Sequence, residues 1–246
     1  MSSPVQMDIY LKTLSLNRIR ECYVAESENA AKAKLSYGDF LYRLIELEAL
    51  SKIDRSINRR IQMSGFPMIR KLEEFDFSYQ PQLDEKLIRE LAGLSFMEHA
   101  KNIILLGPPG VGKTHLAVAL GIKACSQRKS VAFHSADSIA NLLAAAEVAG
   151  NLKNVLTQFA KVDLLIIDEL GYIELNKKNA SLFFQLIAIR YEKKSIIITT
   201  NKPFEEWGQV FGDDTVATAI IDRLLHHAYP FFINGKSFRM KNLINI

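Results

Sequence analysis

The stretch Gly107–Thr114 reads GPPGVGKT and directly follows the apolar run Asn102–Leu106. A strand, a glycine-rich turn and a helix in this order bind phosphate, because the backbone N–H groups of the turn converge and the helix N-terminus adds its positive end. By chance a GxxxxGK(S/T) match arises in about 1% of chains of this length. The sequence therefore predicts a P-loop for ATP, whose expected contacts are Gly107, Pro108, Pro109, Gly110, Val111, Gly112, Lys113, Thr114 and His115.

Three residues of this stretch have separate expected roles. Lys113 would reach the β- and γ-phosphate oxygens, and Thr114 would offer its hydroxyl to Mg²⁺. His115 has a simpler alternative, which is packing against the first turn of the following helix.

A second apolar run, Leu164–Ile167, ends in Asp168 and Glu169. Two acids at a strand end are by themselves unremarkable, but they follow a P-loop at a distance that suits a catalytic site. We expect Asp168 to hold Mg²⁺ and Glu169 to act as the general base toward the attacking water.

Two further polar residues are candidates for the same chemistry. Asn201 ends the run SIIITTN, where it could sense the γ-phosphate or serve as a turn residue before Lys202. Arg223 lies in IDRL near the C-terminus, and arginine stabilises charge on a transferred phosphoryl group, also from a neighbouring subunit. Its spacing equally allows a surface or ion-paired arginine.

The rest of the chain predicts the architecture. Continuous apolar runs at 102–107, 131–135, 162–168, 195–201 and 230–234 alternate with helical patterns, which is typical of an α/β fold with a parallel sheet buried on both faces. Residues 1–70 read as a small helical domain, and their 3,4-spaced apolar residues predict an amphipathic face made of Tyr37, Phe40, Leu41, Leu44, Ile45 and Leu47. Residues 71–246 form the second domain, with 66–84 as a connector draped on it.

Composition narrows the class of protein. The 246 residues are 48% hydrophobic with a net charge of +4, as expected of a globular chain with a mild basic excess. No apolar stretch approaches the roughly 18 residues of a membrane span, and the N-terminus lacks an export-signal pattern, so we expect a cytoplasmic protein with no membrane partner. The only cysteines, Cys22 and Cys125, are too far apart for a disulfide framework or a four-cysteine zinc site.

Basic residues suggest where DNA could bind. The segment 52–71 has six Lys or Arg and one acid. Its arginines are candidate phosphate contacts for duplex DNA, with a solvated or ion-paired helix as the alternative. The candidates, including three lysines of the second domain, are Arg55, Arg59, Arg60, Lys153, Lys177 and Lys178.

Two residue types are expected to be structural. The pair His226-His227 is expected to point to different faces of a helix, so it is not predicted to serve one metal ion. Trp207 is expected to anchor the core.

The GPPGVGKT loop, the LLIIDE strand, the TTN strand end and the late DR together resemble the AAA+ pattern. Over nearly the whole chain, the sequence more specifically resembles the IstB-like helper ATPases of insertion sequences. The most specific matching stretches are INRRIQMSGFP (57–67), DELGYIEL (168–175), FFQLIAIRYEKKSIIITTNKPFEEW (183–207) and AIIDRLLHHAYPFFINGKSFR (219–239).

The resemblance implies a three-layer AAA+ P-loop fold with sheet order 5-1-4-3-2, and ATP with Mg²⁺ held between subunits of a homo-oligomer on double-stranded DNA. It implies that Asn201 is sensor 1, Arg223 an arginine finger acting in trans, and Arg239 a sensor 2 candidate. About a dozen residues follow the last expected strand. They are too few for the separate helical lid domain that usually supplies sensor 2 in larger AAA+ proteins.

The leading hypothesis is an ATP-hydrolysing helper of transposition that assembles on target DNA and recruits or activates a transposase. The alternative is a replicative helicase loader of the DnaC type, since these share the AAA+ core. A small-molecule kinase would need an acceptor pocket and a closing lid, and it would leave Asn201 and Arg223 without roles.

Overall fold

The computed structural model describes residues 4–235, 237 and 238. Contacts divide the chain into two compact units, residues 1–59 and 60–246, whereas the sequence suggested a boundary near residue 70. Each unit is described by itself.

The N-terminal unit is built from helices α1 (Pro4–Thr13), α2 (Asn17–Lys32) and most of α3 (Tyr37–Met63). Its small core is formed by Leu11, Ile19 and Leu44. The buried carboxylate of Glu48 on α3 accepts a hydrogen bond from the backbone N–H of Ile19 at 3.0 Å. Because the first N–H groups of a helix have no partner within it, Glu48 caps the start of α2.

The predicted apolar face of α3 is only partly buried, which corrects the expectation. Leu44 is 8% exposed, but Tyr37 is 95%, Leu41 57% and Ile45 53% exposed. Burial in the unit's small core reaches only part of the predicted stripe, since a unit of this size has little core to offer.

The second unit contains a parallel five-stranded sheet, as predicted. The strands are β1 (Asn102–Leu106), β2 (Val131–Ser135), β3 (Leu164–Leu170), β4 (Ser195–Thr200) and β5 (Ala228–Phe232). Their order is β2-β3-β4-β1-β5, the predicted 5-1-4-3-2 order counted from the other edge. Each neighbouring pair is parallel, so the carboxyl ends of β1, β3 and β4 meet at one edge of the sheet.

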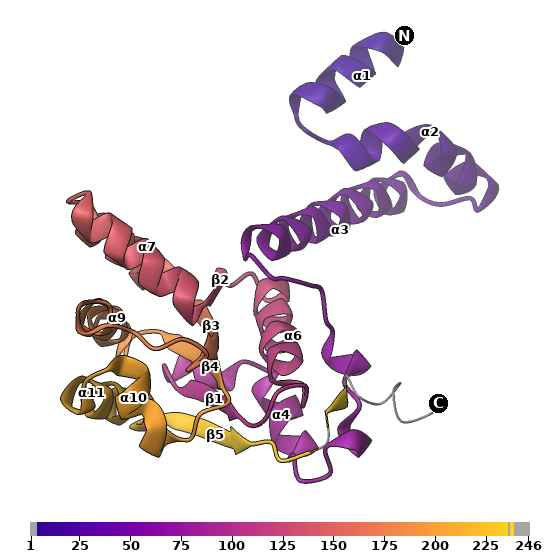
Figure 1. The fold of residues 1–246 in the computed structure, drawn as a ribbon. Helices are drawn as coiled ribbons and strands as arrows, with labels where there is room; N and C mark the ends of the chain where they lie inside the picture. Colours follow the sequence, from indigo (N-terminus) through magenta and orange to yellow (C-terminus); the bar gives the residue numbers. More distant parts are fainter. Residues whose placement is uncertain (1–3, 236, 239–246) are drawn as a thin grey trace, which may run out of the picture. The chain divides into compact units, whose positions relative to one another are not determined.

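Helices cover both faces of this sheet, which gives three layers (Figure 1). Side chains alternate between the two faces along each strand: Ile103 and Leu105 of β1 pack in the core beneath α4 and α6, while Ile104 packs in the core beneath α7, α9, α10 and α11. Trp207 is fully buried in the second of these cores, as expected of an anchor. The helices of this unit are α4 (Glu85–Leu91), α5 (Ser95–Glu98), α6 (Lys113–Ser126), α7 (Ala136–Val148), α8 (Leu152–Lys161), α9 (Lys177–Arg190), α10 (Trp207–Phe211) and α11 (Asp214–Leu225).

The segment before α4 lies against α6. This segment contains two short 3-10 helices, η1 (Leu72–Glu74) and η2 (Phe77–Tyr79). A third 3-10 helix, η3 (Phe204–Glu206), lies elsewhere in the chain, directly before α10. Leu72 is buried in the α6-side core, and Lys123 of α6 lies 2.6 Å from the carboxylate of Glu73. Because Lys123 lies in the last turn of α6, this contact holds the connector against the C-terminal part of the helix.

Candidate nucleotide site

The backbone of the P-loop packs so closely against neighbouring segments that a side chain would not fit at Gly107 or Gly112. Gly112 has φ +99°, a conformation that favours glycine, and a Cβ there would lie 2.6 Å from the ring of Phe75. A Cβ on Gly107 would collide with the carbonyl oxygen of Ile233, whose own N–H donates to Leu106 at 2.7 Å. The loop is thus held tightly between the connector and the segment after β5.

Lys113 is held in place at the start of α6. It is only 8% exposed, and its ammonium group donates to the carbonyl oxygens of Gly107 at 2.6 Å and Pro108 at 2.8 Å. An ammonium folded back over the loop adds its charge to the N-terminal end of the helix, which favours an anion there.

Oxygen ligands gather beside this lysine. The Thr114 hydroxyl lies 3.0 and 3.1 Å from the two carboxylate oxygens of Asp168. The hydroxyl of Thr199 donates to the same carboxylate at 2.5 Å. Hard oxygen donors of this kind suit Mg²⁺, so the set fits the metal that the sequence predicted at Thr114 and Asp168.

Glu169 reaches the site through a distorted backbone. It has φ +59°, which is strained for a residue with a side chain, and the pairing of β3 with β4 is irregular between Ile167 and Leu170. Its N–H donates to the Thr199 hydroxyl at 2.9 Å, while its side chain is exposed at the pocket. Strain is often stored at functional sites, and here it brings two successive residues of one strand to the same site.

A pocket of about 290 Å³ opens between the P-loop, the connector and the strand ends. Its volume is comparable to the small end of ligand sites in proteins, about 300 Å³. The pocket is lined by polar side chains together with aromatic side chains of the connector. The lining residues are Met68, Arg70, Glu74, Phe75, Asp76, Tyr79, Gln80, Pro109, Gly110, Val111, Gly112, Lys113, Thr114, His115, Glu169, Tyr172, Thr199 and Phe238.

The connector is the part of the pocket that the sequence did not predict. Nε2 of His115 lies 2.8 Å from the carbonyl oxygen of Lys71, and its ring packs edge-on against Phe75 at 5.2 Å between centroids. His115 therefore ties α6 to the connector as well as lining the pocket. The aromatic residues of KLEEFDFSYQ were the available signal, since a polar linker rarely needs them.

Thr199 is another part of the site that was not predicted from the sequence. It bridges Asp168 and Glu169 from the adjacent strand, so both acids depend on its hydroxyl for their positions. The signal was a pair of threonines closing an otherwise apolar strand, SIIITT.

Asn201 lies directly after β4, beside the start of the P-loop, because Gly107 N–H donates to Thr200 at 3.1 Å. Its Oδ1 is buried and has no hydrogen-bond partner within residues 4–235, 237 and 238. A buried polar atom without a partner is costly unless a ligand or water satisfies it. Asn201 is not among the described residues that line the pocket.

Arg223 is likewise not among the described lining residues. Its guanidinium donates to Ala219 at 2.9 Å and lies over the rings of Phe184, at 4.6 Å, and Tyr191, at 5.9 Å. The structure therefore brings Lys113, Thr114, Asp168 and Glu169 together but leaves Arg223 on another surface. Arg239 lies outside the described residues.

Some of the candidate DNA contacts have acidic partners. Arg55 lies 3.1 Å from Glu48, an acid just before the basic segment, and Lys178 lies 2.7 Å from Glu147. Arg60 is half-buried, with an Nε that finds no partner in the described part of the chain. Among the described residues, the candidates that are exposed and have no acidic partner are Arg59, Lys153 and Lys177.

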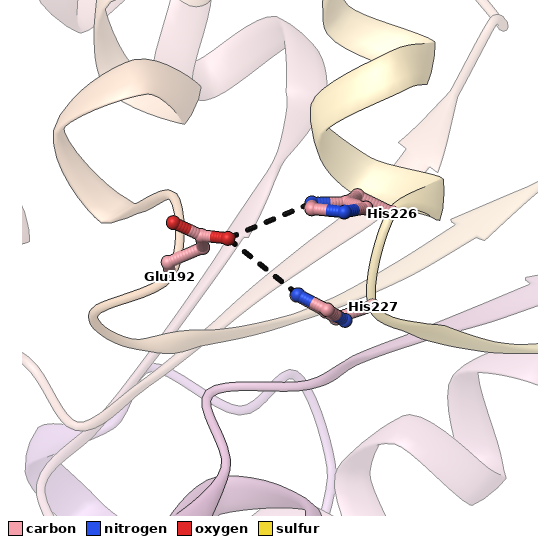
Figure 2. Close-up of side chains that lie close together, drawn as sticks. All are labelled: Glu192, His226 and His227. Carbon is pink, nitrogen blue, oxygen red and sulfur yellow. Dashed lines mark ion pairs between the residues drawn. The ribbon is translucent and has the colours of Figure 1, made fainter.

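The expectation that His226 and His227 point apart is wrong. Helix α11 ends at Leu225, so the two histidines are not on a regular helix. Their rings stack with centroids 4.0 Å apart, and both lie beside Glu192 (Figure 2).

Together the sheet order and the phosphate site define the class as a nucleotide-binding AAA+ P-loop protein. The model of the IstB-like ATP binding protein family matches residues 9–245, so the chain belongs to this family.

Similar sequences come from insertion sequences. The chain is 44% identical over 236 residues to a protein of Pseudomonas aeruginosa named as an ATP-binding protein of insertion sequence IS21, covering 96% of this chain and 89% of that one. It is also 44% identical to a protein of Geobacillus stearothermophilus named in the same way for insertion sequence IS5376, covering 94% of this chain and 92% of that one.

Similar solved structures share the fold. AMPPCP-bound DnaA from Aquifex aeolicus has a TM-score of 0.59 at 22% identity, over 74% of this chain and 55% of DnaA, so the match spans about half of DnaA's length. The DnaC helicase loader has a TM-score of 0.51 at 24% identity, over 61% of this chain and 87% of the loader. Among the described residues, no helix has the length and apolar character needed to span a membrane.

Proposed function

We propose that the chain hydrolyses ATP as a helper of transposition, assembling on double-stranded target DNA and recruiting or activating the transposase of its insertion sequence. The observation that carries the catalytic part is the group formed by Thr114, Asp168, Thr199 and Glu169 at the mouth of the P-loop pocket. The oxygen donors of Thr114 and Asp168 support a metal there, and the exposed carboxylate of Glu169 beside them supports activation of a water.

The chemistry divides among these residues. The P-loop and Lys113 bind the phosphates, and Thr114 with Asp168 would hold Mg²⁺, which supplies charge neutralisation on the β- and γ-phosphates when bound. Glu169 accepts the proton of the attacking water. Asn201 positions that water through Oδ1, which has no partner within the described residues, or the γ-phosphate through its amide N–H group. Arg223 stabilises the transferred phosphoryl group in the site of a neighbouring copy.

The position of Arg223 supports action in trans. Arg223 lies over aromatic rings on the α9–α11 surface and is not among the residues that line this chain's own pocket. An arginine with this task therefore needs the pocket of a second copy, which requires a homo-oligomer.

The N-terminal unit supports assembly and partner contact. Tyr37, Leu41 and Ile45 are exposed at four-residue intervals on α3, so they form one apolar stripe. Exposed apolar stripes of this kind are typical of protein–protein contacts. Exposed Arg59, Lys153 and Lys177 are the proposed contacts to DNA phosphates, and ion-paired Arg55 and Lys178 would have to leave their acids to join them.

A helicase loader is the second candidate, and the fold shared with DnaC supports it. The relatives at 44% identity named for insertion sequences favour the transposition helper.

The test is duplex DNA binding by the 246-residue chain, measured by fluorescence anisotropy with ATP, with ADP and without nucleotide. We expect binding that depends on ATP and weakens as salt rises, because phosphate contacts release counterions. ATP turnover should rise with DNA, and the chain should retain its transposase in an ATP-dependent complex on DNA. Equal binding in all nucleotide states would contradict the proposal, and retention of a replicative helicase instead of the transposase would favour the loader.

A matched pair of variants tests the DNA surface. Arg59→Ala should weaken DNA binding and reduce the salt dependence, whereas Arg20→Ala removes the same charge from α2 and should leave both unchanged. Equal effects of the two variants would show that only net charge matters.

A further inference from the structure

A cluster of metal-binding side chains lies away from the nucleotide site. Oε1 of Glu192 is 3.6 Å from Nδ1 of His226 and 3.5 Å from Nε2 of His227 (Figure 2). The ligand atoms of all three residues lie within 4.8 Å of one another. Glu192 follows α9, and the two histidines follow α11, so residues far apart in sequence meet at one point.

The turn that carries Glu192 is firmly anchored. Arg190, fully buried at the end of α9, donates to the carbonyl oxygens of Val162 at 3.0 Å and Ser195 at 2.7 Å. Its own carbonyl oxygen accepts from the N–H groups of Lys193 at 2.9 Å and Lys194 at 3.0 Å. Glu192 is therefore held in a tight turn on both sides, and its φ of +56° places it there despite the strain.

The backbone of the histidine pair is anchored to the sheet. The carbonyl oxygen of His227 accepts from the N–H of Asn102 at 2.7 Å, and the Asn102 side chain donates to Leu224 at 3.0 Å. The N–H of His226 continues the helical bonding to Asp222. Two anchored segments thus present the three side chains, so little ordering remains for a ligand to impose.

The two distances from the Glu192 carboxylate to the imidazole nitrogens match the donor spacing of a metal site. Metal–ligand distances of about 2.0–2.2 Å place neighbouring donors of a tetrahedral zinc site on the order of 3.4 Å apart. We propose that Glu192, His226 and His227 bind one divalent transition-metal ion of the Zn²⁺ type, with water as the fourth ligand. The side chains are about half exposed, which leaves room for that water.

Donor chemistry selects the kind of metal. Two imidazoles and one carboxylate suit Zn²⁺ and its neighbours Co²⁺, Ni²⁺ and Cu²⁺, whereas Mg²⁺ and Ca²⁺ prefer oxygen ligands only. The cluster therefore differs in preference from the all-oxygen group at Thr114 and Asp168.

Tyr191 sharpens the prediction for His226. Its hydroxyl lies 2.6 Å from Nδ1 of His226. A tyrosine hydroxyl at this distance can donate to Nδ1 whenever that ring nitrogen carries no proton. A metal at Nδ1 would use the same lone pair, which makes Tyr191 a competitor for the metal and not one of its ligands.

The experiment is a Zn²⁺ titration of the tag-free, chelator-treated full-length chain by calorimetry, with excess Mg²⁺ to occupy the P-loop site. Co²⁺ then serves as a spectroscopic probe, since tetrahedral Co²⁺ gives a visible absorption band. We expect one equivalent to bind. His226→Gln, His227→Gln and Glu192→Gln should each weaken binding at least about 10-fold, and Tyr191→Phe should bind as tightly or more tightly.

His99→Gln is the matched control, because His99 is exposed and is not part of the cluster. It should leave the titration unchanged. No binding by the wild type would overturn the proposal and leave an ion pair only. Unchanged binding by the three cluster variants, or loss of binding by Tyr191→Phe, would equally contradict the proposed donor set. Circular dichroism of each variant verifies the fold.

Discussion

The P-loop pocket and the end of α11 carry the two halves of the proposed reaction, and they are built in opposite ways. In the pocket, Lys113 is nearly buried and Asp168 is fixed by two hydroxyl groups. At the end of α11, the Arg223 guanidinium lies on aromatic rings and donates to a carbonyl of its own helix.

The two regions therefore differ in the step to which each would contribute. The pocket is preorganised, so a single chain has what it needs to bind ATP. Within the described residues, Arg223 contacts Ala219, Phe184 and Tyr191 and not the P-loop, so the catalytic role proposed for it would require contact between copies. Binding and hydrolysis should therefore separate in variants.

The largest effect is expected on the pocket side. Lys113→Ala removes the ammonium that bonds Gly107 and Pro108 and should abolish turnover, because ATP binding weakens about 10²-fold or more. Titration with a fluorescent ATP analogue measures this loss. Retained ATP binding would show that Lys113 is not part of the nucleotide site, and the difference between the pocket and the end of α11 would then be lost.

The next largest effect is expected for Arg223 at the end of α11. Arg223→Ala should lower turnover about 10³-fold while ATP affinity stays unchanged, since the pocket is intact. Steady-state ATPase assays and the same titration check both values. Arg223→Lys should not rescue turnover, because lysine lacks the planar fork of arginine. A parallel loss of affinity would place Arg223 in its own pocket.

Glu169→Gln tests the chemistry within the pocket. It should bind ATP normally and hydrolyse it about 10²-fold more slowly, which should trap the ATP-bound chain on DNA. Single-turnover assays measure the chemical step directly. Wild-type turnover would show that another group is the base.

The smallest effect concerns the support of the two acids. Thr199→Val removes the hydroxyl that bonds Asp168 and Glu169, and should reduce turnover about 10-fold with a higher Mg²⁺ requirement. Thr157→Val is the matched control, since the Thr157 hydroxyl bonds only its own helix. An equal loss in both variants would point to stability instead of catalysis.

Much of the fold was accessible from the sequence, because apolar runs buried on both faces leave few alternatives to a parallel sheet. The amphipathic pattern of α3 did not show which of its apolar residues are buried. Periodicity shows that Tyr37 and Leu41 share a stripe but does not show whether this chain supplies a surface to cover it.

The site was predictable where one short motif carries the chemistry, as in Lys113 and Asp168. Thr199 and the connector aromatics were missed because their contribution arises from register and packing between distant segments. His226 and His227 were misjudged because helix α11 ends one residue before them, and helix ends are the least predictable part of a pattern.

In the proposed mechanism, one active site needs two copies of the chain. The most direct test of this requirement mixes Lys113→Ala with Arg223→Ala, after cross-linking has verified that they assemble together on DNA. Each variant alone should be inactive. In the mixture, an intact pocket of the Arg223 variant meets an intact arginine of the Lys113 variant, so ATP turnover should reappear and depend on the mixing ratio. Absence of ATP turnover at every mixing ratio would contradict the action of Arg223 in the site of a neighbouring copy.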